Sequence, residues 1–157
     1  MAGGCFWGVQ AFFDQLEGVV ATTVGYANGK TDSPTYEEVY QDDTGYAETV
    51  ELIYDVQRLS LAKILDCFFR IIDPCSLNAQ GGDSGTRYRT GIYYKDKNEA
   101  ATIEGYVEGI RANYDQPIVT ELLPLENYYP AEEYHQKYLK KNPQGYCHID
   151  LNLIYKE

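Results

Sequence analysis

The sequence has 157 residues, of which 44% are hydrophobic, and this is sufficient for one compact domain with a buried core. We therefore predict a single domain over residues 1–157, acting as a monomer. The formal net charge of −11 at pH 7 argues against nucleic acid and anionic membranes as partners, because both are themselves negatively charged.

The lengths of the hydrophobic runs and the number of cysteines predict the cellular compartment of the protein. No run approaches the ~20 residues that a membrane span requires, and the N-terminal residues do not resemble a secretory signal. We therefore predict a cytoplasmic protein. Its four cysteines are too few for a disulfide scaffold and would be kept as thiols there. They lack the spacing of a zinc site or a thioredoxin-type pair, so we predict no metal ion and no other cofactor.

The first half of the chain predicts alternating helices and strands. In order, they are a helix over residues 6–16, a strand over 19–26, a short helix over 36–40 capped by Thr35, a strand over 49–54 and an amphipathic helix from the cap Ser60 to about residue 72. Residues 36–57 also hold seven acids and no basic residue. Most of these acids should form a solvated face, and Glu48, at a strand entrance, is the candidate exception.

The second half continues the alternation. It predicts a loop over residues 74–87, a strand over 88–95, a helix over 98–114, a last strand over 119–125, a final helix over 131–140 and a tail over 144–157 that has freedom to move. This order predicts an α+β fold, a two-layer αβ sandwich with helices on one face of a mixed sheet. A long loop inside a small domain is often functional, and this loop carries Asp83, Arg87 and Tyr88 at its end.

One cysteine lies where a helix is predicted to begin. Residues 3–8 read GGCFWG, so Cys5 precedes the first helical turn. Free N–H groups and the positive end of the helix dipole favour a thiolate, which is the reactive form. The glycines let a substrate approach the sulfur, and Phe6 and Trp7 would form an apolar wall beside it. We therefore predict that Cys5 is a nucleophile.

Seven strings occur in the order in which one enzyme family carries them. They are GCFWG (4–8), GYANG (25–29), PTYEEV (34–39), GYAE (45–48), GDSGTRYR (82–89), YPAEEYHQ (129–136) and KNPQGYC (141–147). Together they closely resemble the peptide methionine sulfoxide reductases of the A type over nearly the whole chain. The resemblance implies a ferredoxin-like core with a long C-terminal tail over the active site. The family usually has a strand leading into the cysteine motif, and we expect that strand to be missing or shortened here.

The resemblance implies thiol-dependent reduction of the S epimer of methionine sulfoxide, free or in peptides and proteins. Cys5 would attack the sulfoxide sulfur, release methionine and remain as a sulfenic acid. Glu48 corresponds to the family's acid and would protonate the sulfoxide oxygen, since an acid buried among aromatic residues favours its neutral form.

The resemblance also assigns residues that hold the substrate. Tyr26 and Tyr88 would supply hydroxyl groups that bind the sulfoxide oxygen. Asp83 would help to hold the surrounding water or backbone network. Phe6 and Trp7 would bind the terminal methyl group, whose burial is worth roughly 1 kcal/mol.

The remaining cysteines receive different roles. By resemblance, Cys147 is the recycling cysteine, which would form a disulfide with Cys5 that thioredoxin or a similar reductant opens. Gly145 gives that segment its freedom to move. Cys75 stands where the family usually has threonine and is the second candidate for this role. Cys67 lies on the apolar face of its helix and is predicted to be a core residue.

Two other interpretations of Cys5 stay open from the residues alone. A cysteine hydrolase would pair Cys5 with His135 or His148 as a base. A redox-sensing or interaction module would oxidise Cys5 without turnover. We expect His135 to have a structural hydrogen-bonding role.

Overall fold

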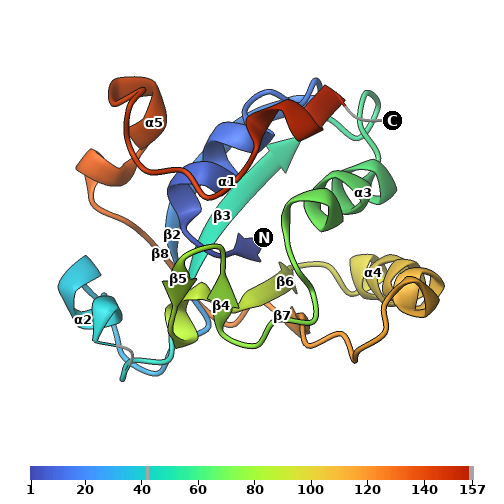
Figure 1. The fold of residues 1–157 in the computed structure, drawn as a ribbon, viewed down its shortest axis with the longest axis horizontal. Helices are drawn as coiled ribbons and strands as arrows, with labels where there is room; N and C mark the ends of the chain where they lie inside the picture. The colour runs from blue at the N-terminus through green and yellow to red at the C-terminus, as the bar shows by residue number, and fades with distance from the viewer. Residues whose placement is uncertain (42, 156–157) are drawn as a thin grey trace.

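The computed structural model describes residues 1–41 and 43–155, so Asp42 of the predicted acidic segment and residues 156–157 of the predicted tail lie outside the described part. Two three-stranded sheets form the centre of the fold, with the orders β3-β2-β8 and β1-β6-β7 (Figure 1). Their strands are β1 (Ala2–Gly3), β2 (Val19–Ala27), β3 (Ala47–Tyr54), β6 (Thr90–Tyr94), β7 (Glu121–Pro124) and β8 (Tyr128–Pro130).

The sheets contain both pairing directions and meet at the first residue. β2 pairs antiparallel with β3 and β8, whereas β6 pairs antiparallel with β1 and parallel with β7. The amino group of Met1 donates a hydrogen bond of 3.0 Å to the carbonyl of Val50, and the Met1 carbonyl accepts one of 2.8 Å from the Val50 N–H. The predicted α+β fold with a mixed sheet is therefore confirmed. The strand that leads into the cysteine motif spans only two residues, as expected.

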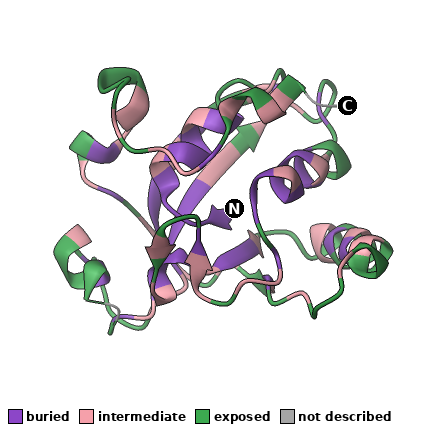
Figure 2. Ribbon diagram, in the orientation of Figure 1, coloured by how far each residue is buried: buried purple, intermediate pink, exposed green. Residues whose placement is uncertain are grey.

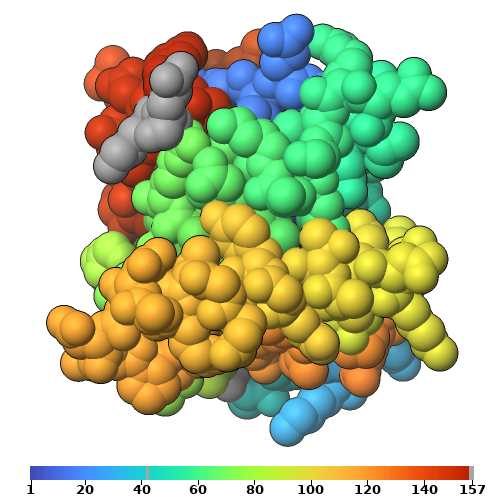
Figure 3. All heavy atoms as spheres, turned by 90° about the vertical axis from the view of Figure 1, so that its right-hand side faces the viewer, coloured from blue at the N-terminus to red at the C-terminus, as the bar shows by residue number. Residues whose placement is uncertain are grey.

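Three longer helices cover the sheets. Helix α1 (Phe6–Phe13) packs on β2 and β3, and α4 (Lys97–Ile110) packs on β6 and β7. Helix α3 (Leu61–Ile71) contacts α4, and Figure 3 shows the two side by side on one face. Figure 2 shows that the buried residues gather on the inner sides of α1 and α3 and along β1 and β6. Large side chains such as Phe12 and Phe13 are fully buried there, and each contributes about 1.5–3 kcal/mol.

Two of the predicted helix starts are confirmed by their caps. Before α2 (Tyr36–Tyr40), the Thr35 hydroxyl accepts from the Glu38 N–H at 3.2 Å, and the Glu38 carboxylate accepts from the Thr35 N–H at 2.9 Å. Before α3, the Ser60 hydroxyl accepts from the Lys63 N–H at 3.1 Å. These bonds satisfy N–H groups that have no partner inside the helix. The acids of α2 are exposed, as predicted.

The predicted loop has more structure than its composition indicated. It contains the hairpin of β4 (Ala79–Gln80) and β5 (Asp83–Ser84), followed by the 3₁₀ helix η1 (Thr86–Tyr88). The prediction that Tyr88 begins a strand is therefore wrong. The Tyr88 N–H bonds to the Gly85 carbonyl at 3.0 Å, which closes a turn before β6 starts.

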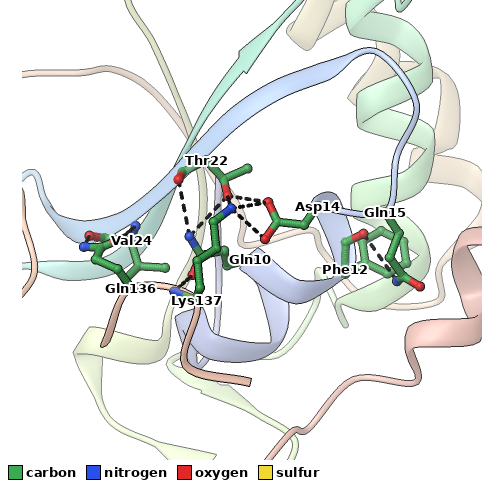
Figure 4. Close-up of polar contacts among 8 residues, drawn as sticks. All are labelled: Gln10, Phe12, Asp14, Gln15, Thr22, Val24, Gln136 and Lys137. Atoms are coloured by element: carbon green, nitrogen blue, oxygen red, sulfur yellow. Dashed lines mark hydrogen bonds and ion pairs between the residues drawn. The ribbon is translucent and has the colours of Figure 1, made fainter. Parts of the chain in front are cut away.

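The predicted final helix is also wrong, and strand β8, which follows β7, was not predicted. The 3₁₀ helix η3 (Glu133–His135) and the short helix α5 (Tyr138–Lys141) replace one continuous helix. Between them, the Gln136 side chain accepts from the Val24 N–H at 3.0 Å and donates to the Val24 carbonyl at 2.9 Å (Figure 4). Lys137 has a φ of 54°, which no α-helix permits. Pairing with β2 therefore overrides the helical pattern.

A buried polar network joins the segment between η3 and α5 to α1. The Lys137 N–H donates to the side chain of Gln10 at 2.8 Å, and the Gln10 amide donates to the Thr22 hydroxyl at 3.1 Å (Figure 4). The Lys137 ammonium group contacts Asp14 at 2.8 Å. Gln10 is only 1% exposed, so these bonds compensate for its burial. The segment after β8 is thus placed by contacts with residues more than a hundred positions away.

The C-terminal segment is anchored along its described length. Ile149 is buried, and the Gln15 side chain donates to the Leu151 carbonyl at 3.1 Å. The segment ends in the 3₁₀ helix η4 (Leu151–Tyr155), which contacts α1 and α3. That it acts as a tail over the active site stays a prediction. The predicted helix over 98–114 divides into α4 and the 3₁₀ helix η2 (Arg111–Asn113).

None of the helices in the described residues is long and apolar enough to cross a membrane.

Candidate active site

Cys5 is the residue immediately before α1 and is 7% exposed. The backbone N–H groups of Trp7 and Gly8 form hydrogen bonds to its sulfur. Gly4 has a φ of 89°, which a residue with a side chain rarely adopts. The chain turns there from β1 into the helix, and this turn directs the N–H groups toward Cys5.

The expectation that the helix start makes Cys5 an easily ionised thiol is wrong for the free protein. Burial raises its pKa, and the negative charges of Glu48 and Asp83 raise it further. The N–H groups of Trp7 and Gly8 act in the opposite direction but are outweighed. A thiolate is the attacking form of a thiol, so the predicted nucleophile would have to lose its proton when substrate binds.

Glu48 lies next to Cys5 although the two are far apart in the sequence. It stands on β3 opposite Tyr26 of β2, and it is only 2% exposed. Its Oε1 accepts a hydrogen bond of 3.2 Å from the backbone N–H of Phe6, the residue that follows Cys5. The acid that the sequence set apart from the solvated face is therefore buried beside Cys5.

Tyr26 is fully buried, and its partner is a residue that the sequence analysis missed. Its hydroxyl donates a hydrogen bond of 2.8 Å to Glu132, whose other oxygen accepts from the Tyr36 N–H at 2.9 Å. Burial alone would raise the pKa of Glu132, but these hydrogen bonds outweigh it and lower the pKa below its usual value. Burial and Glu132 raise the pKa of Tyr26, which keeps its hydroxyl protonated. Glu132 lies inside one of the family strings, which was the signal available.

Tyr88 presents a second buried hydroxyl. The Arg87 guanidinium lies 4.3 Å from the ring centres of both Tyr88 and Tyr40, and its Nη1 donates to the Tyr40 carbonyl at 3.0 Å. Burial and the charge of Glu48 raise the pKa of Tyr88, so this hydroxyl also stays protonated. Arg87 thereby fixes the Tyr88 ring to the end of α2.

Phe6 and Trp7 belong to a cluster of aromatic rings around His135. The Trp7 indole N–H donates to Nδ1 of His135 at 2.9 Å, and the indole stacks on Tyr138 with ring centres 3.7 Å apart. The ring centres of Phe6 and His135 are 5.2 Å apart, and those of Phe6 and Tyr26 are 5.8 Å apart. The two residues predicted to bind the methyl group thus have fixed orientations. His135 has the structural hydrogen bond that we expected.

Asp83 and Cys147 come to the same site from the hairpin and the C-terminal segment. The Tyr146 hydroxyl donates to Asp83 at 2.9 Å. A Cβ on Gly8 would lie 3.1 Å from Sγ of Cys147, so this sulfur packs against the first turn of α1. Its thiol donates to the Ile149 carbonyl at 3.3 Å. All eight predicted site residues therefore surround the start of α1 or reach it through these contacts.

The other two cysteines lie elsewhere. Cys67 is fully buried in the core, as predicted. The Cys75 thiol donates to the Gln116 carbonyl at 3.3 Å, in the connection before β7. All four cysteines are free thiols. Within residues 1–41 and 43–155, neither His135 nor His148 forms a hydrogen bond with Cys5, which a cysteine hydrolase would need.

The described residues hold no group of three or more His, Cys, Asp or Glu side chains that would bind a metal ion.

The whole chain, residues 1–157, matches the family described as peptide methionine sulfoxide reductase. The enzyme named peptide methionine sulfoxide reductase MsrA from Clostridium acetobutylicum is 55% identical over 155 residues, which are 99% of this chain and 96% of that protein.

Solved structures are similar as well. Mxr1 from Saccharomyces cerevisiae in its reduced form has a TM-score of 0.89 and 39% identity, covering 94% of this chain and 86% of that one. Mxr1 in complex with Trx2 has a TM-score of 0.61 and 24% identity, covering 87% and 80% of the two chains.

Proposed function

Because this chain belongs to the peptide methionine sulfoxide reductase family, we propose that it reduces the S epimer of methionine sulfoxide, free or in peptides and proteins, to methionine. The observation that carries this proposal is the pairing of a buried thiol with a buried acid at the start of α1. Cys5 precedes the helix, and Glu48 accepts a hydrogen bond of 3.2 Å from the next residue, Phe6. Such a pair can deliver a nucleophile and a proton to opposite ends of one S–O bond.

In the first step, the sulfur of Cys5 attacks the sulfoxide sulfur. The sulfoxide oxygen takes its proton from Glu48 and accepts a hydrogen bond from the Tyr88 hydroxyl. The Tyr26 hydroxyl, which donates to Glu132 in the free protein, turns from Glu132 to donate to this oxygen. The oxygen then passes to Cys5, which becomes a sulfenic acid while methionine leaves. The substrate sulfur gains two electrons and Cys5 loses two, so this step needs no cofactor.

The methyl group of the substrate fits the ring cluster. Phe6 and Trp7 are held by His135 and Tyr138, so the pocket wall exists before the substrate arrives. A preformed wall avoids the entropy cost of ordering side chains on binding. Asp83 accepts a hydrogen bond of 2.9 Å from the Tyr146 hydroxyl.

Recycling proceeds through a disulfide between Cys5 and Cys147. The contact of the Cys147 sulfur with Gly8 supports this assignment, because Gly8 lies in the same first turn that Cys5 begins. Cys75 bonds to Gln116 instead. Mxr1 has been crystallised with the thioredoxin Trx2, and we assign a thioredoxin as the reductant here too. We also propose that the protein works in the cytoplasm, where a thioredoxin would be available, and that it acts as a monomer. All the proposed site residues come from one chain, which supports the second point.

The deciding experiment is a single turnover with resolved epimers and no reductant. We expect one methionine per protein from the S epimer, two thiols lost and a peptide map that links Cys5 to Cys147. Cys75→Ser is the matched control and should give the same result as the parent. Equal turnover of the R epimer, or a disulfide that contains Cys75, would contradict the proposal.

A further inference from the structure

His148 lies in a cradle that three glycines leave open at the start of α1. A Cβ on Gly4 would lie 2.9 Å from Nε2 of His148, one on Gly81 would lie 2.8 Å from its Cβ, and one on Gly8 would lie 3.4 Å from its Nδ1. Gly4 and Gly81 also have φ values of 89° and 59°, which favour glycine. Two segments of the chain, residues 4–8 and the turn at Gly81, thus make room for this one imidazole.

The hydrogen bonding of the ring fixes its tautomer. Nε2 is 3.0 Å from the carbonyl oxygen of Gly3. A carbonyl only accepts, so Nε2 carries the hydrogen and Nδ1 has the free lone pair. Burial lowers the pKa of His148, which keeps the ring neutral near pH 7. Within the described residues, the buried Nδ1 has no hydrogen-bond partner, so it is available to accept a proton.

The thiol of Cys147 borders the same space as this nitrogen. Sγ of Cys147 lies 3.1 Å, and Nδ1 of His148 lies 3.4 Å, from the point that a Cβ on Gly8 would occupy. The thiol now donates to the Ile149 carbonyl at 3.3 Å, and a rotation about its Cα–Cβ bond turns it toward the ring. A base and an acid therefore lie side by side, over the helical turn that Cys5 begins.

We propose that His148 takes the proton from Cys147 when the disulfide with Cys5 forms. This inference rests on the proposed recycling through Cys147. The Cys147 sulfur attacks the sulfur of the Cys5 sulfenic acid, the S–S bond forms and the S–O bond breaks. The leaving hydroxide then takes the proton held on Nδ1, so water is released and the imidazole is neutral again.

The groups that face His148 suit a brief positive charge. They are Asp83 from β5 and Tyr146 and Cys147 from its own segment. Asp83 is the anionic group among them, and its field favours the imidazolium. The Tyr146 ring lies parallel to the imidazole at 6.5 Å. Because only the thiolate attacks, a base next to Cys147 accelerates this step directly.

The test compares His148→Gln with His148→Ala in a rapid-quench single turnover without reductant, from about pH 5.5 to 9. The amide nitrogen of glutamine keeps the hydrogen bond to Gly3 but cannot take a proton, whereas alanine empties the cradle. Methionine release and disulfide formation are followed separately. We expect the ratio of the second rate to the first to fall at least about tenfold at pH 7 in both variants.

The pH profile distinguishes a His148 that accepts a proton from a His148 that only fills space. The parent's rate of disulfide formation should rise with pH and level off once the imidazole is neutral. In both variants the rate of disulfide formation should keep rising with pH over this range, and added imidazole should accelerate this step in the alanine variant.

Two outcomes overturn the proposal. One is a glutamine variant whose disulfide forms within about twofold of the parent rate across this range. The other is slowing in the alanine variant alone, which would show that the ring only fills space. Cys147→Ser is the separate arm: if a disulfide still forms in it, the recycling route itself is wrong. If that disulfide is lost while glutamine at position 148 has no effect, only the role of His148 is wrong.

Discussion

The indole N–H of Trp7 donates a hydrogen bond of 2.9 Å to Nδ1 of His135, across 128 positions of the sequence. Burial lowers the pKa of His135, so Nδ1 keeps its lone pair at neutral pH and the bond is present under working conditions. This relationship sets the orientation of one wall of the proposed methyl pocket.

His135→Phe removes the acceptor and leaves the indole N–H unpaired, which costs about 1–3 kcal/mol. We expect KM for methionine sulfoxide to rise about five- to tenfold while kcat changes less, because the wall loses its orientation. Trp7 is the single tryptophan, so its fluorescence reports the change directly. His135→Asn keeps an acceptor near Nδ1 and is the control. An unchanged KM in the phenylalanine variant would contradict the role of this bond.

Acidification should destabilise the fold through the two histidines. Burial lowers the pKa of both His135 and His148 from the usual 6.5. Below that value the unfolded chain binds more protons than the folded one, so the free energy of unfolding falls as the pH falls below about 6.5. Urea unfolding at pH 7.5 and at pH 5.5 measures this loss. His135→Gln should reduce it, and an equal loss in that variant would show that His135 contributes nothing.

Glu48→Gln should have opposite effects on turnover and on the thiol. The amide keeps the shape and an oxygen that accepts from Phe6 but carries no acidic proton, so kcat should fall about 10²–10⁴-fold. When Glu48 is ionised in the free protein, its charge raises the pKa of Cys5, so the uncharged amide should lower that pKa. Alkylation of Cys5 by iodoacetamide near pH 8 should then become faster. Slower alkylation together with slower turnover would indicate a distorted site instead of a missing acid.

Gln136→Ala tests the contact that interrupts the predicted last helix. The side chain forms hydrogen bonds with the N–H and the carbonyl of Val24 and with the carbonyl of Ala131. At about 0.5–1.5 kcal/mol each, the loss of the three bonds should lower the free energy of unfolding by about 1.5–4.5 kcal/mol. Denaturant unfolding measures this value. Gln57→Ala, on the exposed loop after β3, is the control and should cost far less.

Local sequence patterns were sufficient to predict the elements whose contacts lie within a few residues along the chain. Thr35 and Ser60 cap helices because their hydroxyls reach N–H groups three residues ahead, and this spacing is visible in the sequence. The apolar stripe of α3 and the position of Cys5 at a helix start follow in the same way. The family strings added the predicted site residues, although they did not reveal the hydrogen bond between Glu132 and Tyr26.

Only the tertiary structure decided the properties that depend on distant neighbours. The predicted final helix does not form because Gln136 bonds to β2 and Lys137 bonds to α1. The spacing of apolar residues in the sequence gives no information about such distant partners. Cys5 is harder to ionise than its helix start suggests, because burial and Glu48 outweigh two N–H groups. A sequence specifies which elements form, since their hydrogen bonds are local. The charge state of a buried group depends on what folding brings beside it, which only the assembled core determines.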